Sequence, residues 1–124
     1  MFIERSIDIE DEVRLALKDH LTAYCRPLPK DYALPHILIS KVGGTDRDKI
    51  DTFEVVLDSR ASTEYEADLT LRNAIGILKA STDTAIRHVT VTSSGSWGGD
   101  PARPDLAMCS ARLRIVAHVE QATF

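Results

Sequence analysis

The sequence predicts an α+β domain, in which a mainly antiparallel four-stranded sheet has two helices packed on one face, in the order α-β-β-α-β-β. Two segments place apolar residues at helical steps of three and four, and four segments are strand-like, rich in branched apolar residues or alternating with polar ones. The link between the first two strands is short and charged, which favours antiparallel pairing. At 124 residues the chain has the length of a single domain, 1–124, with one core.

The first helix is expected from about Ile9 to Tyr24, where one apolar stripe consists of Val13, Ala16, Leu17, Leu21 and Tyr24. Ser6 or Asp8 can accept hydrogen bonds from the free amides at its start. Negative charge at the positive end of the helix dipole comes from Glu10, Asp11 and Glu12. Prolines at 27 and 29 then end the helix, because proline lacks the amide proton.

The first two strands are expected at His36–Val42 and Thr52–Asp58. The first is rich in branched apolar residues and closes on Gly43-Gly44, which is typical of a buried strand followed by a turn. The inward face of the second consists of Phe53, Val55 and Leu57. The charged residues between the strands predict a hairpin whose tip lies in solvent.

The second helix is expected from about Thr63 to Ala80. Thr63 and Glu66 have the spacing of a capping box. The buried stripe consists of Ala67, Leu71, Ala74, Ile75 and Leu78. Gly76 is either one tolerated glycine or a point of close approach to the sheet.

The last two strands are expected at His88–Thr92 and Ala111–Val119. The outward face of the second consists of Arg112, Arg114 and His118. Glycines and prolines between these strands predict a long projecting loop at 93–107, and such loops are uncommon unless they bind a partner or are disordered. Trp97 at its centre either folds back over the core or anchors a partner, since aromatic residues are enriched in interface hot spots.

Charge and apolar content narrow the function classes. Fifteen Lys and Arg residues against 19 Asp and Glu residues give a net charge of −4, which offers no general attraction to nucleic acid. No apolar run approaches the roughly 20 residues of a bilayer span, and the first residues lack the basic start of a signal peptide. We therefore expect a protein that is cytoplasmic or is assembled in the cytoplasm. Cys25 and Cys109 have no metal or disulfide spacing and are expected to be reduced.

The sequence predicts no catalytic, cofactor-binding or metal-binding site. The four histidines lack zinc-site spacing, and the chain has no phosphate-binding loop and no GxSxG nucleophile turn. We therefore expect a protein that is not an enzyme and needs no cofactor. The candidates for an interface with other subunits or partners lie at the hairpin tip, in the long loop and on the outer sheet face: Arg47, Asp48, Lys49, Trp97, Asp100, Arg103, Arg112 and Arg114.

Several strings occur in an order that resembles one family. A short amphipathic helix precedes Pro35–Asp51, which reads PHILISKVGGTDRDKID. Ser62–Ala67, which reads STEYEA, opens the second helix, and a loop rich in Gly, Trp and Pro separates the last strands. Over nearly its whole length the chain resembles the tail terminator proteins of long-tailed bacteriophages and prophages, which are of the tail-completion or neck type.

The resemblance implies a structural protein of the virion. It implies a hexameric ring at the head-proximal end of the tail tube, which stops tube polymerisation and provides the surface that joins the head. The expected partners are copies of this chain, the tail tube protein and a head-completion or connector protein, with no membrane. DNA would pass through the ring without sequence-specific binding, and assembly would take place in the cytoplasm of the bacterial host. The alternatives are another head–tail connector protein of the same fold, or a small cytoplasmic ligand-binding α+β domain or enzyme.

Overall fold

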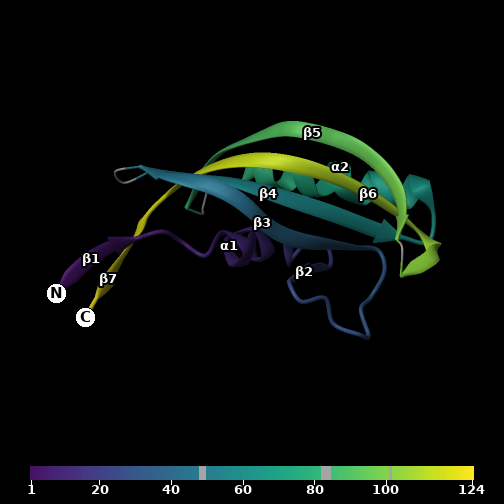
Figure 1. The fold of residues 1–124 in the computed structure, drawn as a ribbon, viewed down its shortest axis with the longest axis horizontal. Helices are drawn as coiled ribbons and strands as arrows, with labels where there is room; N and C mark the ends of the chain where they lie inside the picture. Colours follow the sequence, from purple (N-terminus) through teal and green to yellow (C-terminus); the bar gives the residue numbers. More distant parts are fainter. Residues whose placement is uncertain (48–49, 82–84, 101) are drawn as a thin grey trace.

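The structure, a computed structural model, describes residues 1–47, 50–81, 85–100 and 102–124. Within these residues the chain forms two helices and seven strands: β1 (Phe2–Arg5), α1 (Ile9–Leu17), β2 (Ala23–Cys25), β3 (His36–Arg47), β4 (Ile50–Ala61), α2 (Glu64–Ala80), β5 (Ile86–Asp100), β6 (Arg103–His118) and β7 (Glu120–Thr123). Figure 1 shows a long curved sheet with a short ribbon, formed by the two ends of the chain, at one side.

The predicted four-stranded antiparallel sheet is wrong. The main sheet has five strands in the order β2-β3-β4-β6-β5, and it is mixed because β2 pairs parallel with β3. β1 and β7 form a second, two-stranded antiparallel sheet. The three strands that the sequence did not reveal have only three or four residues each, too few for a clear alternation. Their extended conformation is set by the strands beside them.

Helix α1 is shorter than predicted, because it ends at Leu17 rather than near Tyr24. Its start includes one of the two predicted caps: Asp8 accepts a 3.3 Å hydrogen bond from the amide of Asp11. Beyond the helix the chain turns, and Ala23–Cys25 pairs with β3. Pairing with a neighbouring strand satisfies the main-chain groups of this segment, so tertiary contacts override its helical periodicity.

The second helix matches the expected element, and the central hairpin lies where expected, but β3 and β4 are longer than predicted and pair through most of the expected turn. β3 and β4 pair antiparallel with one register shift after Lys41, and the predicted inward residues of β4 are buried. Thr63 caps α2, since its hydroxyl accepts a 3.2 Å hydrogen bond from the amide of Glu66. Gly76 does not approach the sheet: a Cβ built on it would meet no atom within 4 Å. The glycine therefore leaves open space on the outer side of α2.

The predicted projecting loop at 93–107 is wrong, because β5 and β6 extend through most of it as a hairpin. The pairing tolerates four register shifts, and bulges of this kind admit glycine and serine into a strand pair. The Gly- and Pro-rich composition led to the wrong prediction of a loop, because main-chain pairing between strands does not require any particular side chain. The backbone of Trp97 lies opposite Cys109. The side chains of residues 95–100 lie outside the described part of the chain, so both readings of Trp97 stay predictions.

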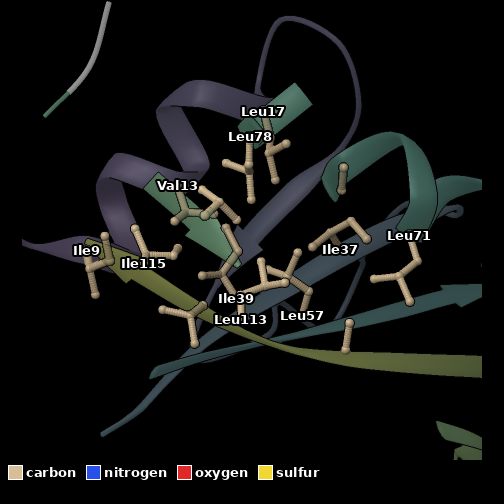
Figure 2. Close-up of a cluster of buried hydrophobic side chains, with 14 of the residues drawn as sticks. Ile9, Val13, Leu17, Ile37, Ile39, Leu57, Leu71, Leu78, Leu113 and Ile115 are labelled. Carbon is tan, nitrogen blue, oxygen red and sulfur yellow. The ribbon is translucent and has the colours of Figure 1, made fainter. Parts of the chain in front are cut away.

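The core lies between the main sheet and the two helices, which cover the same face of it (Figure 2). The side chains drawn and labelled there are at most 3% exposed: Ile9, Val13, Leu17, Ile37, Ile39, Leu57, Leu71, Leu78, Leu113 and Ile115. On the other face of β6, the outward residues Arg112 and Arg114 are exposed. One face of the sheet thus builds the core, while the other remains available for contacts.

Candidate subunit interface

The two-stranded sheet of β1 and β7, together with Met1 and Phe124, forms an arm that extends away from the body of the molecule (Figure 1). The strands pair in register, and the Phe124 amide donates a 2.8 Å hydrogen bond to the Met1 carbonyl. Arg5 Nε lies 2.8 Å from Glu120 Oε1 across the two strands. The arm is therefore held together by main-chain pairing and one exposed ion pair.

The arm exposes large apolar side chains to solvent. Phe2 is 81% exposed and Phe124 is 75% exposed, although both belong to the residue type that proteins most often bury. An isolated two-stranded ribbon is marginally stable in water, because it has no third element on which to bury its side chains. The segment that joins the arm to α1 is held in place, because Ile7 and Ile9 are buried in the core. The arm thus presents aromatic side chains from a fixed base.

A groove of about 690 Å³ lies between α2 and the segments that precede β2 and β3. Its apolar walls consist of Leu21, Leu34, Pro35 and Ile77. Gly76 adds no side chain, and the open space beside it belongs to this groove. Arg72 and Asn73 line it from the same helix as polar residues. The groove has the volume and the mixed lining of a binding site.

The predicted interface residues do not form one cluster. Arg47 ends β3 at one end of the sheet, and Arg103 begins β6 at the other end (Figure 1). Asp48 and Lys49 lie outside the described residues, as do the side chains of Arg47, Trp97 and Asp100. Arg103 Nη2 lies 3.0 Å from Asp105 Oδ2, and this hydrogen bond lowers the pKa of the Asp105 carboxyl.

The remaining two predicted residues lie together on the open face of the sheet. Arg114 faces Glu54 of β4, with 3.4 Å between Arg114 Nη2 and Glu54 Oε1. Arg112 is exposed and lies opposite Val56. Because an exposed ion pair contributes only about 0.2 to 1 kcal/mol, these arginines add little to stability. Both guanidinium groups are exposed and therefore accessible to a partner.

Glu10 joins three segments near the base of α1. Its Oε2 atom accepts a 2.7 Å hydrogen bond from Arg26 and a 3.2 Å hydrogen bond from the amide of Lys41. Arg26 also donates to the carbonyl of Lys41 at 3.2 Å. The hydrogen bond from Arg26 is the main cause that lowers the pKa of Glu10, against the opposing effect of burial. Glu10 thus connects α1 to β3 as well as lying at the helix start.

Replacing Glu10 with glutamine is expected to lower the free energy of unfolding by about 1 kcal/mol at pH 7, because it weakens a charge-assisted network. The folded-state pKa lies below the ordinary value of 4.5, so the stabilisation is fully present above that value. It is lost as the pH falls through the folded-state pKa. Urea unfolding of both proteins across pH 3 to 7 measures the difference.

Glu12→Gln is the matched control, because Glu12 lies in the same first turn and contributes the same charge to the helix dipole. Its effect should be smaller at pH 7. A loss for Glu10→Gln that stays constant down to pH 3 would contradict the ionic role of Glu10.

Both cysteines are free thiols in surroundings that disfavour the thiolate. Cys109 is buried and Cys25 is half-buried, and burial raises the pKa of each thiol. The Cys25 thiol lies 3.3 Å from the carbonyl of Glu10, to which it donates. At neutral pH both side chains therefore behave as small apolar groups.

The chain matches no protein-family model and no curated protein. Within the described residues, no helix has the length and apolar character needed to cross a bilayer.

The arm and the groove are the two surface features that the sequence analysis did not predict. The arm could have been suspected from the apolar residues Met1, Phe2 and Ile3, which lie outside every predicted element. The groove depends on how α2 packs beside the segments before β2 and β3, so it leaves no local pattern.

Proposed function

We propose that this protein is a ring-forming subunit of the tail-terminator type, which caps a phage tail tube and offers a joining surface for the head. The observation that supports this most is the arm, with Phe2 and Phe124 exposed on a ribbon that has no surface of its own to cover them. Apolar residues in this arrangement favour burial against another molecule. The family resemblance of the sequence supplies the kind of assembly.

The occupant of the groove in this proposal is the arm of the next copy. The arm extends away from the body of its own chain (Figure 1), so its aromatic residues are placed to reach a neighbour. A contact between two different surfaces of the same chain is heterologous, and repetition of such a contact closes into a ring when the rotation is suitable. The arm and the groove are two different surfaces of the chain, each with exposed apolar groups, as a heterologous contact requires.

Native mass spectrometry and negative-stain microscopy test the proposal, on the protein alone and after addition of tail tube protein. We expect annular particles, either alone or at the ends of tubes, and shorter tubes as the protein concentration rises. A species that stays monomeric under both conditions, and leaves tube length unchanged, would contradict the proposed function.

Replacing Phe2 with serine is expected to reduce ring formation about tenfold or more, because an interface anchor is lost while the fold loses little burial. Sedimentation velocity measures the assembled fraction, and thermal unfolding should be nearly unchanged. Tyr65→Ser is the matched control, since Tyr65 is 72% exposed on α2. Equal loss of assembly in both variants would show that the effect is not specific to the arm.

A small-molecule-binding domain is the second candidate, and the groove of about 690 Å³ is the observation that favours it. A saturable ligand in the groove of a protein that never forms rings would select this alternative.

A further inference from the structure

Asp51, near the start of β4, is a buried acidic residue that has no hydrogen-bond partner among the described residues. The residue is 1% exposed, and neither carboxylate oxygen has a hydrogen-bond partner in the described part of the chain. An ionised carboxylate left unpaired away from water costs several kcal/mol, so native proteins pair such groups with cations or donors. An unpaired buried group in a native structure often indicates a missing ion or water.

Asp51 lines a cavity of about 190 Å³ between the segment that joins β1 to α1 and the β3–β4 hairpin. The other residues around it are Ser6, Lys41, Gly44, Thr45, Thr52 and Phe53. Three of these carry hydroxyl groups, and oxygen atoms are the ligands that Mg²⁺ and Ca²⁺ prefer. The chemistry of this cavity therefore matches that of a hard cation.

Lys41 is a basic residue that also lines the cavity, and its ammonium contacts an aromatic ring of the same lining. Its Nζ atom lies over the ring of Phe53, 5.2 Å from the centroid. No ion pair links it to Asp51 among the interactions of the described residues. The charge of Asp51 is thus not neutralised by this side chain.

The backbone beside the cavity leaves no room for a side chain at position 44. Gly44 has φ +153°, and a Cβ there would lie 2.5 Å from the carbonyl oxygen of Thr52. A side chain at position 44 would therefore displace the strand beside the cavity.

We propose that this cavity binds one divalent cation of the Mg²⁺ or Ca²⁺ class, with the Asp51 carboxylate as its charged ligand. Hydroxyl groups of the cavity and water complete the oxygen shell, as is usual for Mg²⁺ held by one or two carboxylates. Ser6 joins the arm to α1, so the bound cation holds the base of the arm against β4. The site is independent of the proposed function.

Titration with Mn²⁺, followed by amide NMR spectra of the intact protein, tests the site directly. We expect selective broadening of the signals of Ser6, Gly44, Thr45 and Thr52 in the wild type. Asp51→Asn should abolish this broadening. Asp58→Asn is the matched control, because Asp58 lies on the same strand but pairs with Ser110 on the open face. Its spectra should broaden as those of the wild type do.

Thermal unfolding provides the second measurement. With a dissociation constant of about 1 mM, 10 mM Mg²⁺ should raise the Tm of the wild type by about 5 °C and leave that of Asp51→Asn unchanged. In EDTA, Asp51→Asn should be at least as stable as the wild type, because it removes an unpaired buried charge.

Three results would overturn the site. The first is the absence of selective broadening in the wild type up to 10 mM Mn²⁺, and the second is its persistence in Asp51→Asn. The third is a Tm loss of several degrees for Asp51→Asn in EDTA that Lys41→Met reproduces, since Lys41 would then be the internal partner of Asp51.

Discussion

Replacing Ile115 with alanine is expected to lower the free energy of unfolding by about 2 to 5 kcal/mol. Ile115 is fully buried in β6, and its cross-strand neighbours are Phe53 on β4 and Val89 on β5. Figure 2 shows it in the core cluster near Ile9 and Val13. A smaller side chain leaves a cavity that strands fixed on both sides cannot close. Urea unfolding measures the loss.

Val116→Ala is the control, because Val116 follows Ile115 in the same strand and faces the open side of the sheet, where it is half-buried. It should cost about 1 kcal/mol or less. Equal costs for both substitutions would show that the burial of Ile115 does not determine its contribution.

Replacing Gly76 with tryptophan is expected to reduce ring formation about tenfold or more, because the indole fills the groove that the proposal assigns to the neighbouring arm. The variant should fold, since a Cβ at this position meets no atom within 4 Å and tryptophan favours a helix more than glycine does. Sedimentation velocity at matched concentrations measures assembly, and circular dichroism measures the fold.

Gly76→Ala separates the helix effect from the groove effect. It should stabilise the chain by about 0.5 to 1 kcal/mol and leave ring formation unchanged. Rings formed by Gly76→Trp but not by Phe2→Ser would show that the arm docks outside the groove. Failure of the wild type to assemble would instead contradict the ring itself, so the two failures are distinguishable.

Segments with strong local signals were predictable from the sequence. The hydroxyl of Thr63 caps α2 by accepting from the amide of Glu66, and the apolar stripe of the helix fixes which side is buried. In β4, Phe53 and Leu57 alternate with polar residues, and both are buried as this pattern predicts. These elements are defined by their local sequence, because capping and alternation depend on residues a few positions apart.

Segments defined by distant partners were not predictable. β2 extends a helical pattern but pairs with β3, and β1 pairs with β7 across almost the whole chain. The hairpin of β5 and β6 passes through a stretch whose composition favours a loop. Asp51 is an acidic residue on the inward side of β4. Its burial depends on the register of β3 against β4 and on the segments packed over that side of the sheet, and no local sequence pattern predicts these two features.

The place of β6 in the sheet has a consequence for the folding rate. β6 lies between β4 and β5 and pairs with both, so these two strands do not pair with each other. During synthesis the sheet cannot close until residues 103–118 have left the ribosome, and until then β4 and β5 each present an unpaired edge. Contacts that span so much of the chain slow folding and expose intermediates to aggregation. Ribosome-bound chains that lack β6 should therefore be the species that chaperones retain.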